Sequence, residues 1–310
     1  MKDLKVVFMG TPDFAVPVLK ELIEKTNVVL VVTKEDKEVG RKKILTPSPV
    51  AVEAASHGIE VFKPHRLKND YQLILDKDPD IIITCAYGQI VPVPVLEYPS
   101  LGCINVHASL LPKYRGASPI TAAIMAGEEK TGITIMYMEE GLDTGNIIHA
   151  AEISIDEEDT GGSLSEKLSI LGAELLMKTL PSIIDETNFS LAQNEEEATY
   201  VGLLKREDER IDFHDTAKNI VNKIRALNPE PLANILIDNE EWKILKAEIG
   251  ENQKGEIGLI SEVGKDYFSI NCQDGSIKVL EIKPFGKKNM TVKDFLNGYK
   301  KENLINKKVG

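Results

Sequence analysis

The chain has 310 residues, which is too long for one ordinary hydrophobic core and suits two domains. Hydrophobic residues make up 42% of it, so global disorder is excluded, and the first apolar run, residues 6–9, is too short for a signal peptide. Nothing approaches the roughly 18 apolar residues that a membrane span needs. The sequence therefore predicts a soluble, cytoplasmic protein with no membrane partner.

Charge is distributed unevenly along the chain. The net charge of −12 argues against a protein that coats nucleic acid over its whole surface. Residues 209–310 carry 17 Lys/Arg against 16 Asp/Glu, a net of +1, whereas residues 1–208 carry 20 against 33, a net of −13. A partner that bears phosphates would have to meet local basic patches.

The three cysteines, Cys85, Cys103 and Cys272, lie far apart and form no C-x-x-C pair. Neither a zinc site nor a disulfide framework is predicted, and we expect no bound metal. Cys85 and Cys103 fall in apolar runs, so we expect them to be small buried side chains.

In chain order, the first half alternates short apolar runs with segments of helical length. The expected strands are residues 6–9, 28–33, 59–62, 81–86, 103–107 and 133–138. The expected helices are residues 15–25, 50–57, 71–77 and 119–126. Several strands are apolar almost throughout, which is typical of strands buried on both faces. The pattern predicts an α/β fold with a Rossmann-like, mostly parallel sheet, flanking helices and right-handed crossovers.

A long helix is expected over residues 162–184, where leucines recur at helical spacing and Pro181 should bend or interrupt the end. The polar residues 185–210 that follow show little periodicity. We place a first domain at residues 1–189, a linker at 190–208 and a second domain at 209–310.

The second domain begins with an expected helix over residues 216–226 and then changes character. Short strand-like runs at residues 232–237, 242–249, 255–262, 267–271 and 276–282 are separated by turn signals such as Asp274-Gly275. This spacing predicts a small OB-like β-barrel.

Three polar residues suggest acyl-transfer chemistry. Asn105 and His107 are two apart near the end of an expected strand, so they share one face at the edge where open α/β sheets bind ligands. An amide and an imidazole there can donate to an oxygen that becomes negative. Asp143, between Gly141 and Gly145, adds a carboxylate. Taken singly, each could equally satisfy local backbone groups.

Together these segments resemble one family. The run GCINVHASLLP at residues 102–112, YRG at 114–116 and GLDTG at 141–145 are similar to the motifs of 10-formyltetrahydrofolate-dependent formyltransferases. FMGTPDFA at residues 8–15, AYG at 86–88, Asn228-Pro229 and GKKNM at 286–290 extend the resemblance over nearly the whole chain.

The resemblance implies an enzyme that moves a formyl group from 10-formyltetrahydrofolate to the α-amine of methionine carried by initiator tRNA. Asn105 and His107 would stabilise the oxyanion of the tetrahedral intermediate, and Asp143 would handle the proton, directly or through water. No metal is required, and we expect a monomer. The residues implied to line the folate site are Ser109, Leu110, Leu111 and Pro112.

A basic stretch, residues 34–43, falls where the family places a loop that contacts tRNA. Arg41, Lys42 and Lys43 are the implied phosphate contacts. The stretch differs from family members in carrying several acidic residues where prolines and glycines are usual. A second difference is Glu230, which stands between two prolines where an aromatic residue is common.

Three other functions remain open from the sequence. A related formyltransferase could act on a nucleotide-linked amino sugar, but the basic stretch favours tRNA. A non-catalytic tRNA-binding protein is disfavoured by the intact set of Asn105, His107 and Asp143. A nicotinamide oxidoreductase is disfavoured because Gly10-Thr11-Pro12 replaces the glycine fingerprint of dinucleotide-binding folds.

Overall fold

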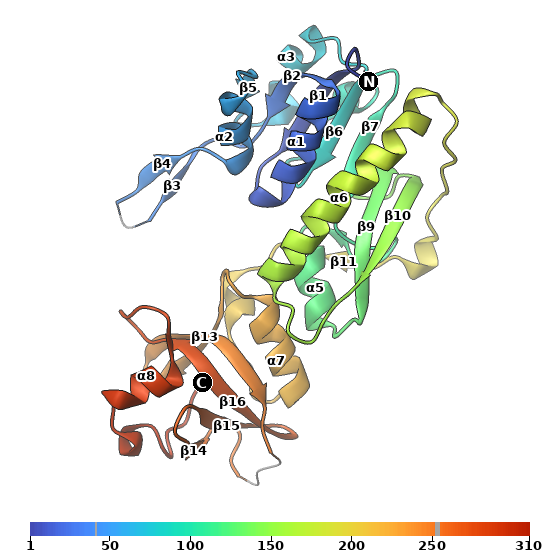
Figure 1. Ribbon diagram of the computed structural model, residues 1–310. Helices are drawn as coiled ribbons and strands as arrows, with labels where there is room; N and C mark the ends of the chain where they lie inside the picture. Colours follow the sequence, from blue (N-terminus) through green and yellow to red (C-terminus); the bar gives the residue numbers. More distant parts are fainter. Residues whose placement is uncertain (41, 252–254) are drawn as a thin grey trace. The chain divides into compact units, whose positions relative to one another are not determined.

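A computed structural model describes residues 1–40, 42–251 and 255–310. The chain forms two compact units (Figure 1). The first consists of Met1–Pro119, Lys130–Ser154 and Ser165–Gly202, and the second of Ile120–Glu129, Ile155–Leu164 and Leu203–Gly310. The predicted fold class, a Rossmann-like sheet followed by a small antiparallel β-structure, is confirmed.

The first unit is built on a seven-stranded sheet in the order β10-β9-β7-β6-β1-β2-β5. The strands are β1 (Lys5–Gly10), β2 (Asn27–Val32), β5 (Val61–Phe62), β6 (Ile81–Cys85), β7 (Cys103–His107), β9 (Lys130–Tyr137) and β10 (Ile147–Ser154). The five strands from β5 to β7 run parallel, and β9 runs antiparallel to β7 and β10. All five residues of β6 are buried, as the apolar runs predict for a sheet covered on both faces.

The parallel strands β5-β2-β1-β6-β7 follow five of the six positions of the Rossmann order 3-2-1-4-5-6, and the strand order reverses between β1 and β6. Because β6 and β7 are neighbouring parallel strands, their carboxyl ends lie next to each other at the edge where such sheets bind ligands. Cys85 and Cys103 are buried in these strands, as predicted, and burial raises the pKa of the Cys103 thiol to about 12.

Helices lie beside this sheet (Figure 1). They are α1 (Val16–Lys25), α2 (Pro49–Ser56), α3 (Gln72–Asp76), α4 (Val93–Leu96) and the part of α6 (Gly161–Ile184) from Ser165 onward. Helix α5 (Pro119–Met125) belongs, except for Pro119, to the second unit. The start of α2 is fixed locally, because the Ser48 hydroxyl accepts from the Ala51 amide and Pro49 occupies the first helical turn.

The expected interruption of the long helix at Pro181 is wrong. Helix α6 continues through Pro181 to Ile184. A proline this close to the end removes a single amide donor, and its own carbonyl still accepts from the Asp185 amide.

Two small strand pairs complete the first unit. The hairpin of β3 (Lys37–Val39) and β4 (Ile44–Thr46) is antiparallel and exposed throughout. The pair of β8 (Arg115–Gly116) and β11 (Tyr200–Val201) is parallel and ties two segments far apart in sequence. Short 3-10 turns lie at Asp13–Ala15, Leu67–Asn69 and Glu195–Glu197.

The second unit is an antiparallel sheet in the order β12-β13-β16-β15-β14, with β17 beside β16. Its elements are α7 (Ala217–Ala226), β12 (Ala233–Ile237), β13 (Glu240–Ile249), β14 (Ile260–Val263), β15 (Phe268–Cys272), β16 (Gly275–Lys283), β17 (Met290–Thr291) and α8 (Val292–Asn297), with 3-10 turns at Arg206–Glu209 and Lys301–Asn303. Each strand run expected here from the sequence contains or overlaps a strand.

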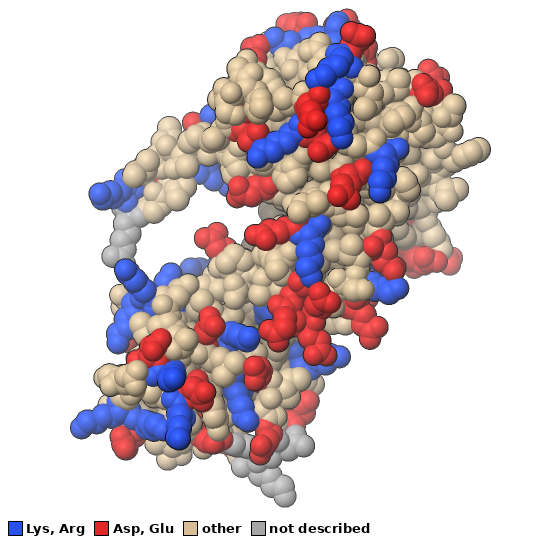
Figure 2. Space-filling view, viewed as in Figure 1, with Lys and Arg blue, Asp and Glu red and all other residues tan. Residues whose placement is uncertain are grey.

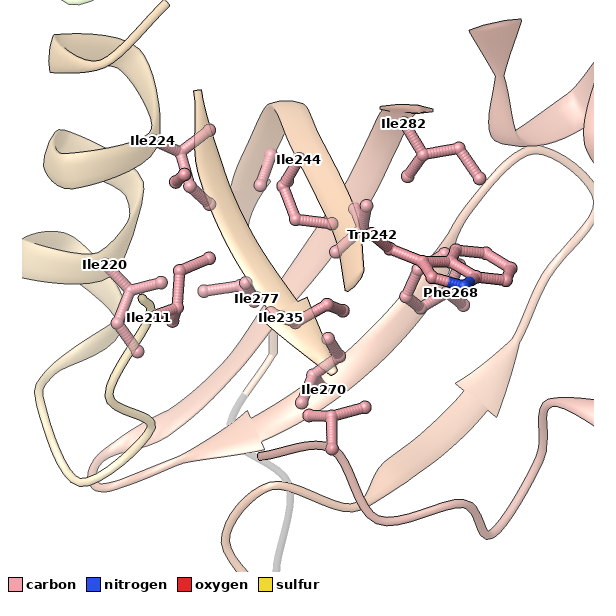
Figure 3. Packing of buried hydrophobic residues seen from close by; sticks show 14 of the residues in the cluster. Ile211, Ile220, Ile224, Ile235, Trp242, Ile244, Phe268, Ile270, Ile277 and Ile282 are labelled. Atoms are coloured by element: carbon pink, nitrogen blue, oxygen red, sulfur yellow. The ribbon is translucent and has the colours of Figure 1, made fainter. Parts of the chain in front are cut away.

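Isoleucines from α7 and from the five strands β12 to β16 help to fill the core of this unit, and Figure 3 shows most of them. Trp242 closes one end of that core and meets the Phe295 ring edge-on, with ring centroids 5.1 Å apart. Burial of so much branched apolar surface is what holds a sheet of this size together.

Candidate active site

The three residues singled out in the sequence come together at the end of β7. The Asn105 amide donates from Nδ2 to Asp143 Oδ1 over 3.3 Å. His107 Nδ1 lies 3.6 Å from Asp143 Oδ2. Because Asn105 and His107 are two apart on one strand, both side chains reach the same carboxylate.

The Asp143 loop is shaped to present this carboxylate. Asp143 has a φ of 53°, in the left-handed region that most residues avoid. At Gly145, a Cβ would lie 2.0 Å from the Tyr137 carbonyl oxygen, so only glycine fits beside the end of β9. The Gly116 amide donates to Asp143 Oδ2 over 2.8 Å, which adds a fixed backbone donor to the two side chains.

The orientation of the Asn105 amide follows from its neighbour on β6. The Thr84 hydroxyl donates to Asn105 Oδ1 over 2.9 Å, so Nδ2 must face Asp143. One hydrogen on Nδ2 goes to the carboxylate, and Nδ2 carries a second. This arrangement holds an oriented amide donor at the carboxyl edge of the sheet.

His107 is more tightly engaged than the sequence suggests. Its side chain is 6% exposed, and Nε2 lies 3.0 Å from the Tyr114 carbonyl oxygen, to which it donates. The 3.6 Å between Nδ1 and Asp143 Oδ2 is too long for a hydrogen bond. Because Nε2 is committed to the Tyr114 carbonyl, the geometry makes Asn105 the more available donor and places the His107 ring beside the carboxylate.

The four residues implied to line the folate site form a tight turn after β7. The Ser109 hydroxyl donates to the Lys113 carbonyl over 2.6 Å, so it is committed to the turn. Ser109 and Leu111 are buried, and the Thr134 hydroxyl bonds with both of their backbones. Leu110 and Pro112 are half-buried, so these two side chains retain surface that a ligand could contact.

Two residues that sequence reasoning did not assign to the site support it. Arg115 is fully buried and donates to Gln193, Glu195 and Tyr200. Gln193 in turn donates to the backbone carbonyl of Asp143 over 2.8 Å. Arg115 lies within the motif at residues 114–116, so the family resemblance could have marked it as a site residue. Gln193 lies in the polar stretch read as a linker, where no pattern marked it.

Two of the basic residues predicted to bind tRNA, Lys42 and Lys43, lie in the turn between β3 and β4. Arg41 lies outside the described residues. Lys42 and Lys43 are exposed, and Lys43 Nζ lies 3.4 Å from a carboxylate oxygen of Glu38. Figure 2 shows Lys/Arg side chains at the hairpin. The same hairpin exposes the apolar side chain of Leu45.

Within residues 1–40, 42–251 and 255–310, no group of three or more His, Cys, Asp or Glu side chains could hold a metal ion. All three cysteines are free. In the same described ranges, no helix has both the length and the apolar character to cross a bilayer.

Comparison with known proteins extends the resemblance to both units. Residues 4–180 match the family model of formyl transferases, and residues 203–300 match that of the formyl transferase C-terminal domain. The methionyl-tRNA formyltransferase of Staphylococcus epidermidis is 49% identical over 306 residues, covering 98% of each chain.

Solved structures of lower identity share the fold. The sugar 3N-formyltransferase WlaRD, determined with dTDP and 5-N-formyl-THF, has a TM-score of 0.67 and 23% identity, covering 93% of this chain and 100% of its own. The methionyl-tRNA formyltransferase from Clostridium thermocellum has a TM-score of 0.57 and 18% identity, covering 80% of this chain and 94% of its own. With both units matched and nearly half of all residues shared with a full-length relative, the chain belongs to the formyltransferase family.

Proposed function

We propose that this enzyme transfers the formyl group of 10-formyltetrahydrofolate to the α-amine of methionine esterified to initiator tRNA. The observation that carries the proposal is the 49% identity to a methionyl-tRNA formyltransferase across 98% of both chains. The convergence of Asn105, His107 and Asp143 supports it, because these groups match what formyl transfer to an amine requires.

The first chemical need is stabilisation of negative charge. The amine nitrogen bonds to the formyl carbon, and the carbonyl electron pair moves onto oxygen. The Asn105 amide, oriented by Thr84, would donate to that oxyanion. A preorganised donor of this kind typically contributes 10² to 10³ in rate, or about 3–4 kcal/mol.

The second need is proton movement. The attacking ammonium loses a proton, and the nitrogen of the departing folate gains one. Asp143 would accept the first proton, directly or through water, and return it to the leaving nitrogen. A free α-amine titrates near pH 8, so modest assistance suffices. His107, whose Nδ1 lies 3.6 Å from Asp143 Oδ2, would help to keep the carboxylate oriented.

The folate would be held beside this trio by the turn after β7. Leu110 and Pro112 keep partly exposed apolar surface there, whereas Ser109 and Leu111 hold the turn in place. Partly exposed apolar side chains beside the Asn105 amide donor fit a substrate with a flat apolar ring and a single reactive carbonyl. The structure determined with 5-N-formyl-THF belongs to a sugar formyltransferase of the same fold.

Arg41, Lys42 and Lys43 of the β3–β4 hairpin would bind the phosphates of the tRNA. The near-neutral residues 209–310 would form the second tRNA-binding region. We place catalysis in residues 1–189 and treat 190–208 as the connection. The three site side chains come from one chain, so a monomer is sufficient. Substrates that belong to translation support a cytoplasmic location for the enzyme.

The deciding assay supplies 10-formyltetrahydrofolate and compares two acceptors, methionyl initiator tRNA and nucleotide-linked amino sugars. Transfer to the tRNA with little transfer to the sugars is expected. The reverse preference would assign the chain to the sugar formyltransferases, whose fold it shares.

A further inference from the structure

Gln193 connects a distant segment to the loop that carries Asp143. Its Nε2 donates to the Asp143 carbonyl and to the Gly145 carbonyl, each over 2.8 Å. Its Oε1 accepts from Arg115 Nε over 3.0 Å and from Nη2 over 2.9 Å. Both hydrogens and both lone pairs of the amide are therefore used.

These partners fix which way the amide points. A rotation of the Gln193 amide by 180° would place Oε1 against two carbonyl oxygens and Nε2 against two guanidinium donors. Only the orientation described satisfies all four groups. A glutamine in this position cannot be replaced by a carboxylate without losing both donors to the Asp143 loop.

Arg115 is itself immobilised. Its side chain is fully buried, and its five N–H groups all donate: two to Gln193, two to Glu195 and one to the Tyr200 hydroxyl. The pair of β8 and β11 adds backbone bonds, with the Arg115 amide donating to the Thr199 carbonyl over 2.8 Å. Bidentate arginine pairs of this kind give geometric precision as well as energy.

The contacts close into a ring. Asp143 Oδ2 accepts from the Gly116 amide, Gly116 follows Arg115 in the chain, the Arg115 side chain binds Gln193, and Gln193 binds the Asp143 backbone. The carboxylate is thus held from its side chain and its main chain at once. A residue with a φ of 53° needs such external support to keep its conformation.

We propose that Gln193 is a positioning residue for formyl transfer, which fixes the Asp143 loop so that the carboxylate meets the reacting amine in one geometry. The proposal rests on the catalytic role proposed above for Asp143. Gln193 acts through the two carbonyl bonds and has no contact with the formyl group. A displacement of a catalytic group by about 1 Å can cost roughly 10²-fold in rate.

The sharpest variant is Gln193→Glu. It keeps the side-chain length and the acceptors for Arg115, and gains a charge that pairs with the guanidinium, but it removes both donors to the loop. We expect kcat to fall roughly 10²-fold with little change in KM for either substrate. The thermal midpoint should fall as well, because a carboxylate oxygen then faces the carbonyls of Asp143 and Gly145. Gln193→Ala should lower kcat as well, with some loss of stability because Arg115 also loses a partner.

Asn194→Ala is the matched control. Asn194 is the neighbouring amide and caps the 3-10 turn at Glu195–Glu197, with Oδ1 accepting from the Glu196 amide. Removing it loosens the same segment without touching the loop that carries Asp143, so kcat should stay near the wild-type value. An equal fall in kcat in Asn194→Ala and Gln193→Glu would overturn a specific role for Gln193.

Coupling to Asp143 gives a second readout. If Gln193 acts only through Asp143, adding Gln193→Glu to Asp143→Asn should not reduce the residual single-turnover rate any further. Full additivity of the two effects would overturn the proposal. So would a Gln193→Glu variant that turns over as fast as wild type.

Hydrogen exchange separates this proposal from the proposed function. In Gln193→Glu, the Gly116 amide and the amides of residues 141–145 should exchange faster than in wild type or Asn194→Ala. Unchanged exchange there overturns the positioning role. A wild-type chain that transfers no formyl group would refute the proposed function, while the exchange result still decides whether Gln193 holds the loop.

Discussion

At the scale of single residues, the site is a carboxylate held by two amide donors beside an imidazole. Asp143 accepts hydrogen bonds from Asn105 Nδ2 and from the Gly116 amide, and His107 Nδ1 lies 3.6 Å from Oδ2. The two hydrogen bonds fix the direction of the carboxylate. Because its proposed role is to accept a proton, the charge of Asp143, and not only its hydrogen bonds, should matter for the reaction.

The first prediction tests that charge. Asp143→Asn is isosteric and can keep the bond from Gly116, but it cannot accept a proton. We expect formyl transfer to fall by about 10² to 10⁴, while the thermal midpoint changes little. The measurement is single-turnover transfer to methionyl initiator tRNA, with the exposed Asp266→Asn as control. Wild-type turnover in Asp143→Asn would remove Asp143 from the mechanism.

The second prediction concerns pH. Hydrogen bonds from Arg115 hold the pKa of Glu195 below its ordinary value of 4.5. A depressed pKa stabilises the fold above the unfolded-state value and loses that contribution as pH falls through the folded-state value. The free energy of unfolding of wild type should therefore exceed that of Glu195→Gln at neutral pH, and the difference should shrink below about pH 4.5. A constant difference would refute the ion pair.

The shared strand face predicted that Asn105 and His107 lie together, and the family resemblance of the loop at residues 141–145 added Asp143. The structure brings the three side chains together, and their catalytic roles stay proposals. The sequence could not reveal Gln193. That side chain bonds a carbonyl 50 residues away, from a polar segment without periodicity. Long-range bonds to backbone leave no local pattern, since any chain segment supplies carbonyls.

At the scale of elements, burial decided what could be predicted. Strands such as β6 and β7, buried on both faces, read clearly as apolar runs. Strand β10 was missed because it lies at the sheet edge and alternates between exposed and half-buried residues. Every residue of the two strands β3 and β4 is exposed, so these strands show no core-facing pattern that would mark them.

The third prediction belongs to that hairpin. Replacing Arg41, Lys42 and Lys43 with Ala should weaken binding of initiator tRNA. It should also reduce the slope of log K against log salt, by roughly one for each replaced side chain that binds a phosphate. Replacement of Lys2, Lys20 and Lys25, which removes the same number of charges outside the hairpin, serves as the control for net charge. An unchanged slope would show that the hairpin does not bind phosphate.

At the scale of the whole molecule, each unit has a separate apolar core. The core of the second unit contains Trp242, the only tryptophan in the chain, and Phe268 (Figure 3). Tryptophan fluorescence therefore reports on unfolding of that unit. Its midpoint should respond to cavities made in this core.

The fourth prediction uses this probe. Phe268→Ala should lower the free energy of unfolding followed by Trp242 fluorescence by about 3–5 kcal/mol, because it leaves a cavity in a fully buried site. Phe285 is 64% exposed, so Phe285→Ala should change the same free energy of unfolding by less than about 0.5 kcal/mol. Similar losses in the two variants would contradict the packing described.

The segmented make-up of the second unit has a consequence for proteolysis. Lys205 and Arg206 are exposed, so trypsin should cut between or just after them. The amino-terminal fragment would contain residues 155–164, which belong to the second unit. Hydrogen bonds join these residues to the carboxyl-terminal fragment: the carbonyls of Asp156 and Asp159 accept from Arg225, and the Gly162 amide donates to the Asn228 carbonyl. We expect the nicked protein to show two bands on a denaturing gel and to elute as one species from a sizing column. Elution of two separate fragments would show that the non-covalent contacts within the second unit do not hold the fragments together after cleavage.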